Sequence, residues 1–355
     1  MQSILSNNYS ICFNESGYET LNKLLKDNKY SNIFIIVDSN TNDKCLHHFL
    51  PYLATDLKIE IVAFDNGEIN KNIETCIEIW QVLTDYGADR KSVIINLGGG
   101  VVTDLGGFVA STYKRGIDFI NIPTTLLSMV DASIGGKNGI DLGNLKNQIG
   151  TINNPELVII DTAYLETLDQ AEMRSGLAEM LKHGLIADAE YWQKFQDLSL
   201  LDSDNLEQLI YESIVIKNNI VTQDPTENGI RKALNFGHTL GHAIESYFLT
   251  NPNKKTLLHG EAIAVGMILE SYISLKKNLI NITEYQQIKS TINNVFDKIL
   301  FDENDINPIL DLLIHDKKNE YGTIQFALLD GIGEIKINQS VDNELIIKAF
   351  DDYKN

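Results

Sequence analysis

The sequence predicts an α/β fold in two parts, a doubly wound and mainly parallel sheet followed by a mainly helical region. Two observations support this prediction. Up to about residue 162, short apolar runs rich in β-branched residues alternate with amphipathic stretches. Beyond that point long amphipathic stretches dominate, and strand-like runs return only near the end. We therefore expect an α/β domain over residues 1–162 and a mainly helical domain over residues 163–355.

The first half contains five apolar runs that we expect to be buried parallel strands, because strands covered on both faces lack polar alternation. They cover residues 32–40, 58–64, 92–98, 117–123 and 156–161. A helical stretch up to about Leu53 and a second one over residues 71–86 separate the first three runs. In such a sheet, ligands bind where the strands end.

The second half contains six stretches with helical periodicity. They cover residues 170–187, 204–223, 235–249, 259–277, 283–299 and 305–315. Two short strand-like runs follow, FALLD and GEIKIN.

Composition narrows the possible partners. The chain has 355 residues and a formal net charge of -20, which argues against nucleic acids and anionic membranes as ligands. Its three cysteines lack motif spacing, which suits a reducing cytoplasm. Neither a signal peptide nor a membrane-spanning run is evident, so we expect a cytoplasmic protein with a small-molecule substrate.

Polar and glycine residues follow several predicted strands. Gly98, Gly99 and Gly100 come directly after one strand and precede a helix, an arrangement in which backbone N–H groups can meet a pyrophosphate. The alternative is an ordinary tight turn. Asp38 ends an earlier strand, where a carboxylate can accept from ribose hydroxyls, and Thr124 and Thr125 end a later one. Together they favour a nucleotide at this edge of the sheet.

Lysines beside glycines indicate an anion-binding loop. Lys137 follows Gly135-Gly136 in what we expect to be a short loop, and Lys146-Asn147 lies close by in the sequence. The alternative is that these lysines are simply solvated. Arg115 before Gly116 can likewise be a plain helix C-cap.

Three histidines in a short stretch indicate a metal site. His238 and His242 lie one helical turn apart, and His259 opens the next helical run. A catalytic zinc takes three protein ligands and leaves one position open. Ordinary buried or helix-capping histidines are the alternative.

An acidic residue on an apolar helical face is a further candidate ligand. Glu179 lies among leucines, alanines and methionines and needs a partner. A metal ion is one possibility and a salt bridge with Lys182 is the other. His183 is a rival to His238 as a ligand, and we rank it second.

These stretches, taken together, resemble the 3-dehydroquinate synthase family, whose wider relatives are the sugar-phosphate cyclases. The resemblance rests on a series of motifs in family order rather than on one motif. They are GE..K at 67–71, GGGVVTDLGGFVASTYKRG at 98–116, IPTTLLSMVDASIGGK at 122–137, LKNQIG at 145–150, RSGLAEMLKHGLI at 174–186, RKALNFGHTLGHAIE at 231–245, HGEAIAVGM at 259–267 and DKK at 316–318.

The resemblance implies a cytoplasmic, homodimeric lyase of the shikimate pathway. Such an enzyme converts 3-deoxy-D-arabino-heptulosonate 7-phosphate to 3-dehydroquinate and phosphate with NAD and one zinc or cobalt ion. The implied metal ligands are Glu179, His238 and His259. The residues implied to bind NAD are Asp38, Glu68, Lys71, Gly99, Gly100, Val101, Asp104, Thr124, Thr125, Lys137, Lys146 and Thr167. The residues implied to contact substrate are Asp131, Lys137, Asn147, Lys182, Lys217, Arg231, Asn235, His242 and Lys318, with Arg115 reaching the partner subunit's phosphate site.

The sequence departs from the family pattern at Asn138, at Asn153-Asn154 and in a long linker over residues 246–258. None of these departures removes a candidate ligand. The competing hypotheses are a sibling cyclase acting on glucose 6-phosphate or a heptulose 7-phosphate, an NAD- and metal-dependent polyol dehydrogenase, and a non-catalytic NAD-sensing module.

Overall fold

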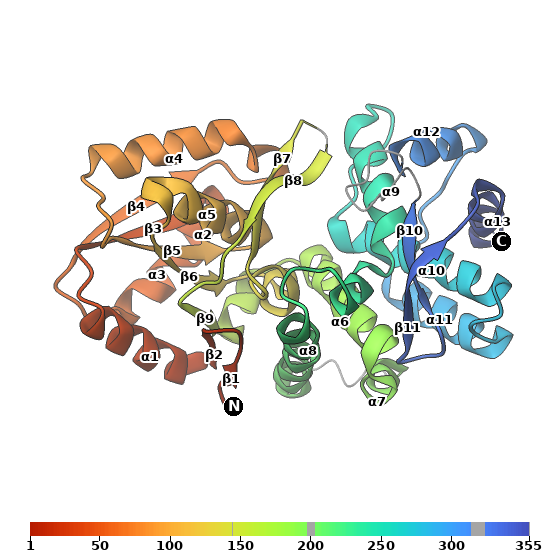
Figure 1. Cartoon of the computed structure of the whole chain (residues 1–355), viewed down its shortest axis with the longest axis horizontal. Helices are drawn as coiled ribbons and strands as arrows, with labels where there is room; N and C mark the ends of the chain where they lie inside the picture. Colours follow the sequence, from red (N-terminus) through yellow and green to blue (C-terminus); the bar gives the residue numbers. More distant parts are fainter. Residues whose placement is uncertain (144, 197–202, 314–323, 355) are drawn as a thin grey trace. The chain divides into compact units, whose positions relative to one another are not determined.

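The computed structural model (Figure 1) describes residues 1–143, 145–196, 203–313 and 324–354. The chain divides into two units, Met1–Asp169 and Gln170–Asn355. The first unit contains a mainly parallel sheet and the second is mainly helical, which confirms the predicted fold class.

The first unit is built on a seven-stranded sheet with the order β1-β2-β9-β6-β5-β3-β4. The five predicted strands are all present. Within this sheet, only the pairing of β1 with β2 is antiparallel. Short β1 and β2 were not predicted, because two to four residues carry too little periodicity to recognise. The strands are β1 (Ile4–Leu5), β2 (Ser10–Phe13), β3 (Asn32–Asp38), β4 (Lys58–Phe64), β5 (Val93–Gly98), β6 (Asp118–Pro123) and β9 (Leu157–Ile160).

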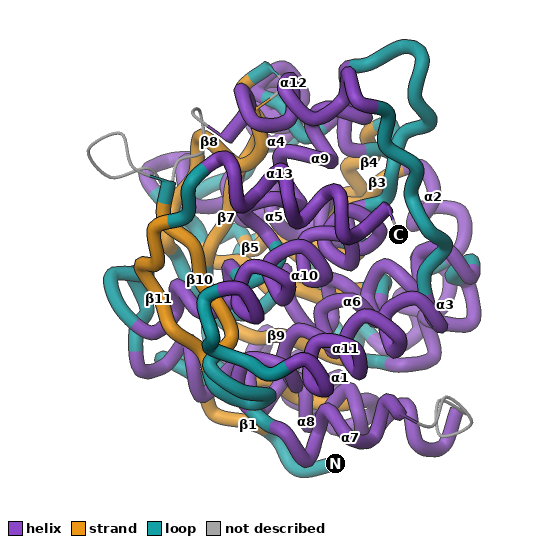
Figure 2. The backbone as a smooth tube through the Cα atoms, turned by 90° about the vertical axis from the view of Figure 1, so that its right-hand side faces the viewer, coloured by secondary structure: helices purple, strands orange, loops and turns teal. Residues whose placement is uncertain are grey.

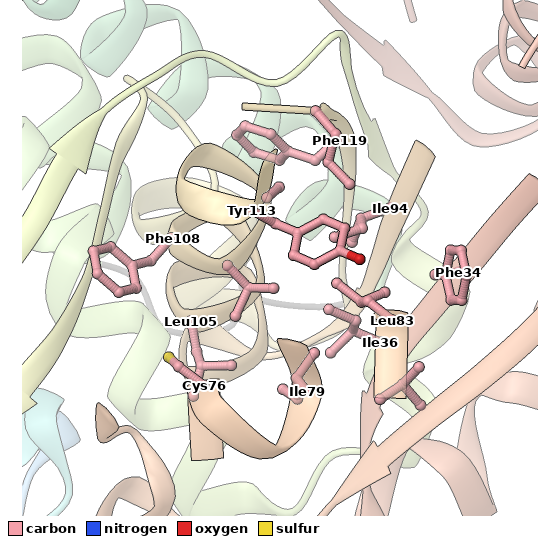
Figure 3. Close-up of a cluster of buried hydrophobic side chains, with 14 of the residues drawn as sticks. Phe34, Ile36, Cys76, Ile79, Leu83, Ile94, Leu105, Phe108, Tyr113 and Phe119 are labelled. Carbon is pink, nitrogen blue, oxygen red and sulfur yellow. The ribbon is translucent and has the colours of Figure 1, made fainter. Parts of the chain in front are cut away.

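Apolar side chains of α4 and α5 pack on β3, β5 and β6 to form the core on one side of this sheet (Figure 3). Leu83 and Leu105 from the helices and Phe34 and Ile94 from the strands are fully buried there. The helical segments of this unit are α1 (Asn14–Asp27), α2 (Ser39–Lys44), α3 (Leu46–Phe49), η1 (Leu50–Tyr52), η2 (Glu68–Asn70), α4 (Ile73–Asp85), α5 (Gly100–Thr112), η3 (Tyr113–Arg115), η4 (Ser128–Ala132) and η5 (Thr162–Thr167).

The sheet reverses its strand order between β3 and β5. From β3 the chain continues outward to β4, whereas from β5 it continues to β6 and then β9. This topological switch point is where open α/β sheets bind ligands, at the carboxyl ends of the strands. Asp38 ends β3 and Gly98 ends β5, so both predicted cofactor segments lie at that point.

One expectation for this unit was wrong. The segment around Lys137 is not a short loop but an antiparallel hairpin of β7 (Lys137–Leu142) and β8 (Leu145–Ile152). Gly139 pairs with Gly150, and a Cβ on Gly150 would lie 2.4 Å from the carbonyl oxygen of Asn138. The two backbones therefore approach too closely for larger residues, and Gly139 and Gly150 permit the pairing. The Gly135-Gly136 pair, which indicated a loop, lies outside both strands.

Helices make up most of the second unit (Figure 2), and the six predicted ones are all present. Helices α7 and α13 were not predicted. The elements are α6 (Gln170–Ala187), α7 (Ala189–Gln193), η6 (Lys194–Gln196), α8 (Ser203–Gln223), η8 (Ile230–Asn235), α9 (His238–Thr250), α10 (His259–Lys276), α11 (Ile282–Val295), α12 (Glu303–Leu313), β10 (Gln325–Leu329), β11 (Ile335–Ser340) and α13 (Asn343–Lys354).

Helix α10 is buried on nearly all sides, and it packs against α6, α9, α11 and α13. It therefore forms the centre of this unit. Within the described ranges, no helix combines the length and the apolar character needed to cross a membrane. All three cysteines are free and buried.

Candidate active site

The turn from β5 into α5 provides a backbone surface at the switch point. Gly99 is the N-cap of α5, and a Cβ placed on it would lie 3.0 Å from Cγ2 of Thr125. The N–H of Thr124 donates to the carbonyl of Gly98 at 3.0 Å, which joins this turn to the end of β6. Gly100, Val101 and Asp104 follow in the first turns of α5. The helix end and its N–H groups are suited to an anion such as a pyrophosphate.

A buried lysine connects this turn to the β7–β8 hairpin. The Nζ of Lys71 donates to Oδ2 of Asp104 at 2.6 Å and to Oδ1 of Asn147 at 2.7 Å. Burial lowers the pKa of Lys71, but the carboxylates of Asp104, Glu68 and Asp141 outweigh burial and raise it well above its ordinary value. Lys71 is therefore a permanent cation that holds three segments of the first unit together.

Asp141 extends this network and was not among the predicted site residues. Its Oδ1 accepts from the backbone N–H of Asn147 at 2.7 Å, and its Oδ2 lies 3.6 Å from Nζ of Lys146. Asn147 has a left-handed backbone with φ of 49°, so this bond stabilises a conformation that non-glycine residues seldom adopt. Lys146 also pairs with Glu68 at 2.7 Å. The sequence feature that could have indicated Asp141 is an acidic residue within the otherwise apolar stretch Gly139–Leu142.

The remaining predicted residues of this unit lie on different elements and have different partners. Oδ1 of Asp38 accepts from the N–H of Thr41 at 2.7 Å and caps α2, which leaves Oδ2 as its further acceptor. Thr167 donates its hydroxyl to the carbonyl of Tyr164 at 2.8 Å. Lys137 begins β7 and Asp131 lies in η4. Arg115 has φ of 72° and borders a shallow pocket lined also by Asp89, Arg90 and Lys114.

In the second unit, Glu179 and two imidazoles converge from three helices. Glu179 of α6 is fully buried. Its Oε1 lies 3.4 Å from Nε2 of His238 on α9 and 3.6 Å from Nε2 of His259 on α10. The ligating atoms of His238, His242 and His259 all lie within 4.8 Å of one another. The three predicted ligands are therefore neighbours, and His242 adjoins them.

The second ring nitrogens of two imidazoles have partners that set their orientation. Nδ1 of His238 lies 3.1 Å from the carbonyl of Phe236, and Nδ1 of His259 lies 3.1 Å from Oε2 of Glu245. Metal-binding histidines almost always bond through the other nitrogen to a carbonyl or carboxylate in this way. Glu245 was not among the predicted site residues. Its position two helical turns after His238 is the signal that places it on the same face.

The electrostatic field of the carboxylates at this cluster favours positive charge. Burial lowers the pKa of His259, but Glu245 and Glu179 outweigh burial and raise it to about 10. Carboxylates that stabilise a proton on this imidazole will also stabilise a dication held by its neutral form.

Of the two alternatives that the sequence left open for Glu179, the structure contains the salt bridge. Its Oε2 forms an ion pair with Lys182, whereas its Oε1 faces the imidazoles. His183, the rival ligand, lies one position further on α6 and is fully buried. Its Nδ1 lies 2.8 Å from the hydroxyl of Ser213 on α8.

Three more predicted residues lie on elements of the second unit that pack together. Lys217 of α8 and Arg231 of η8 are buried, and the Arg231 guanidinium donates to the carbonyl of Pro225 at 2.7 Å. Asn235 donates to Oε1 of Glu227 at 2.8 Å. Lys318 lies outside the described residues.

Comparison with known proteins assigns this arrangement to a family. The model of the 3-dehydroquinate synthase N-terminal region matches residues 61–175, and that of the C-terminal region matches residues 176–319. The chain belongs to the 3-dehydroquinate synthase family. It is 42% identical over 336 residues to the 3-dehydroquinate synthase of Parabacteroides distasonis, with 94% of each chain covered. It is 41% identical to that of Dictyoglomus thermophilum, over 94% of this chain and 93% of the relative. The chain is thus an enzyme of this type.

Solved structures of sugar-phosphate cyclases are similar over the full length. A 2-deoxy-scyllo-inosose synthase complexed with carbaglucose-6-phosphate, NAD+ and Co2+ matches with a TM-score of 0.85 and 26% identity, over 99% of both chains. The 2-epi-5-epi-valiolone synthase of Streptomyces hygroscopicus with NAD+ and Zn2+ bound matches with the same TM-score and identity, over 100% of this chain and 99% of that one. A probable glycerol dehydrogenase of Sinorhizobium meliloti, at 14% identity and a TM-score of 0.66, shares the fold.

The donor set of the second unit fits a divalent cation. One carboxylate and two or three imidazoles are the ligand types that zinc and cobalt accept, and three protein ligands are typical of a catalytic zinc. The anchored Nδ1 atoms of His238 and His259 leave Nε2 as the nitrogen of each ring that could bind a cation.

Proposed function

We propose that the chain is a 3-dehydroquinate synthase, which converts 3-deoxy-D-arabino-heptulosonate 7-phosphate to 3-dehydroquinate and phosphate. The overall reaction comprises transient oxidation, loss of phosphate, re-reduction and intramolecular aldol closure. The observation that carries the proposal is the convergence of Glu179, His238 and His259. It gains weight because relatives 37–42% identical have this name.

NAD and one zinc or cobalt ion would supply the reversible oxidation and the acidification of a sugar hydroxyl. Glu179, His238 and His259 would hold the metal ion. Lys182 neutralises the second oxygen of Glu179, so that a single anionic oxygen faces the imidazoles. His242, one turn after His238, is suited to hold or move a proton on a substrate hydroxyl.

The cationic residues of the second unit would bind the anionic groups of the substrate. Lys217 and Arg231 place two buried positive charges in a protein with a net charge of -20, and buried cations attract anionic groups. The planar guanidinium of Arg231 and the compact ammonium group of Lys217 both suit carboxylate and phosphate oxygens. Asn235, held by Glu227, can donate to the same substrate.

The first unit would bind NAD at its switch point. The Gly99–Asp104 segment would receive the pyrophosphate, and the Oδ2 acceptor of Asp38 would receive a ribose hydroxyl. Lys71 joins Asp104 and Asn147 in one hydrogen-bond network, which would present the amide of Asn147 to the ligand. Glu68, Thr124, Thr125, Lys137, Lys146 and Thr167 would complete the cofactor site, and Lys137 and Asp131 would also contact substrate.

We also propose a cytoplasmic homodimer in which Arg115 reaches the partner subunit's phosphate site. The basic side chains beside it in the pocket, Arg90 and Lys114, suit that role. Arginine binds phosphate oxygens through paired N–H bonds, whereas lysine binds them as a point charge.

The proposal is tested by a phosphate-release assay with the heptulosonate. Release should require both NAD and the metal, so a chelator should abolish it and added Co2+ or Zn2+ should restore it. NADH should not accumulate, because the cofactor ends the cycle oxidised. The Lys137→Ala variant should release no phosphate.

Three outcomes would contradict the proposal in different ways. Release from glucose 6-phosphate or a heptulose 7-phosphate, but not from the heptulosonate, would identify a sibling cyclase. Net NADH formation with glycerol would identify a polyol dehydrogenase. Binding of NAD without turnover of any of these compounds would identify a non-catalytic module.

A further inference from the structure

Helix α9, which carries His238 and His242, begins without a side-chain cap of its own. Its N-cap residue is Gly237, which has φ of 77° and no side chain that could accept a hydrogen bond. The first backbone N–H groups of a helix lack partners within the helix, so buried ones need partners from elsewhere.

Glu270 of α10 supplies this cap. Its Oε2 accepts from the N–H of Gly237 at 2.7 Å, and its Oε1 accepts from the N–H of Leu240 at 3.1 Å. Leu240 is the third residue of α9, and its N–H is one that an N-cap side chain ordinarily binds. The N–H of Gly237 is the one that the acid of a capping box ordinarily binds. One carboxylate from a neighbouring helix therefore makes both bonds.

The environment of Glu270 argues against a mere packing role. The residue is fully buried in the middle of α10, among apolar side chains. A buried carboxylate is costly unless hydrogen bonds and positive charge compensate for it. The N-terminus of α9 provides both, since its N–H groups carry the positive end of the helix dipole. An apolar residue at position 270 would fill the space but would leave the start of α9 uncapped.

The bonds of Glu270 fix the position of α9 along α10. The two helices run antiparallel, since Gly237 lies against Met267, Gly241 lies against Ile263 and Glu245 contacts His259. At the Glu270 end, a Cβ on Gly266 would lie 1.9 Å from the carbonyl oxygen of Gly237. At the other end, Glu245 of α9 accepts from the imidazole that opens α10. Each helix thus contributes one carboxylate that accepts hydrogen bonds from the first residues of the other helix.

We propose that Glu270 is a positioning residue for the metal centre, because it sets the register of α9 on α10 and so the placement of His238 relative to His259. The residues that it binds, Gly237 and Leu240, flank His238 in the sequence. Both bonds of Glu270 to α9 end on backbone N–H groups, so they act on His238 through the backbone of its helix. The inference rests on the proposed function, in which both histidines are ligands.

The test is a Co2+ titration of the metal-free full-length chain, followed by its visible spectrum and by the dissociation constant from chelator competition. The Glu270→Gln variant keeps the size of the side chain but turns an N–H donor towards α9. We expect at least a tenfold weaker binding of Co2+ and a changed intensity of the d–d bands. The control for lost stability is the Ile292→Ala variant, which leaves a cavity at a buried position of α11, a helix that also packs on α10. It should lower Tm but keep the wild-type spectrum.

Wild-type affinity and spectrum in Glu270→Gln would overturn the inference, as would equal weakening in the Ile292→Ala control. Should Glu270→Gln fail to fold, Glu270→Asp takes its place, since it keeps the charge but is one methylene too short. Weaker binding in Glu270→Asp supports the inference, and unchanged binding overturns it. Absence of Co2+ binding in the wild type would instead refute the proposed metal site, which separates the two failures.

Discussion

The first unit places a buried lysine among carboxylates, whereas the second places a buried carboxylate among imidazoles. Lys71 is held by Asp104 and has Glu68 and Asp141 near it, so its charge is met by protein groups. Glu179 has one oxygen on Lys182 and the other 3.4–3.6 Å from two imidazoles. Imidazoles are neutral or cationic near neutral pH, and only their neutral form can bind a metal ion.

This difference indicates that the two regions have different roles: one shapes a binding surface, and the other provides the donor atoms of a binding site. The Lys71 network joins the glycine turn, the 67–71 segment and the hairpin, and so it shapes the surface on which we propose NAD binds. The Glu179 cluster is a set of donor atoms that suits a dication. Variants in the two regions should therefore have separable effects, and they are given below from the largest expected effect to the smallest.

Removing the cation of the first unit should have the largest effect on stability. Lys71→Met leaves the partly buried Asp104 without its ion-pair partner, and breaking a fully buried pair costs roughly 3–5 kcal/mol. We also expect a dissociation constant for NAD at least tenfold higher, because Asn147 and Asp104 lose their common partner. Urea denaturation and calorimetric titration with NAD measure the two effects.

The control for Lys71→Met is Lys58→Met, which removes an exposed lysine of β4 paired with Glu60. It should change neither quantity appreciably, since exposed ion pairs contribute little. Affinity for Co2+ should be unchanged in both variants. A Lys71→Met protein that loses Co2+ but keeps NAD would contradict the division of roles between the two regions.

Separating α9 from α10 should have the next largest effect. In Gly266→Ala the new methyl group would lie 1.9 Å from the carbonyl oxygen of Gly237 and 2.9 Å from the N of Gly241. These are backbone atoms, so the helices must move apart, and overpacking of this kind costs about 1–3 kcal/mol. Thermal unfolding and Co2+ competition should both show a loss, while NAD affinity should stay the same.

The Ser274→Ala variant is the control for Gly266→Ala. Ser274 is equally buried in α10, but its hydroxyl donates within its own helix to the carbonyl of Glu270. It should keep wild-type affinity for Co2+. Tight Co2+ binding by Gly266→Ala would show that the histidines do not depend on the close contact of the two helices.

The sequence predicted five strands of the main sheet, most helices and the polar ends of the strands, because these follow from local periodicity and turn chemistry. It missed the hairpin, because the polar side chains of residues 146–148 hid the alternation of β8. Glu270 was also missed. Nothing near it in the sequence indicates that it caps a helix beginning 32 residues earlier, at His238. Such contacts depend on how the helices pack, and no local pattern encodes them.

The smallest effect should come from the linker between α9 and α10. Asp305 of α12 accepts from Lys254 of this linker at 2.6 Å and from Tyr247 at 2.7 Å. Burial raises the pKa of Asp305, but these donors and the N–H of Asp302 outweigh burial and lower it below its ordinary 3.8. A lowered pKa stabilises the fold above about pH 3.8, and this contribution is lost as the pH falls further.

Asp305→Asn should therefore lower the free energy of unfolding by about 0.5–1.5 kcal/mol at pH 7. The difference from the wild type should shrink below about pH 4, as the native carboxylate becomes protonated. Urea denaturation between pH 3 and pH 7 measures this, with exposed Asp311→Asn of the same helix as the control. A difference that grows on acidification would contradict the sign of the pKa shift.

The most direct test of the account is the metal content of purified variants after loading with Zn2+ and dialysis. We predict one equivalent per chain in the wild type and in His183→Gln, because the ligands that we propose are Glu179, His238 and His259. We predict less than about one tenth of an equivalent in His259→Ala, since a site of three protein ligands rarely retains its metal with two. Retention of a full equivalent by His259→Ala, together with loss in His183→Gln, would contradict the proposed site.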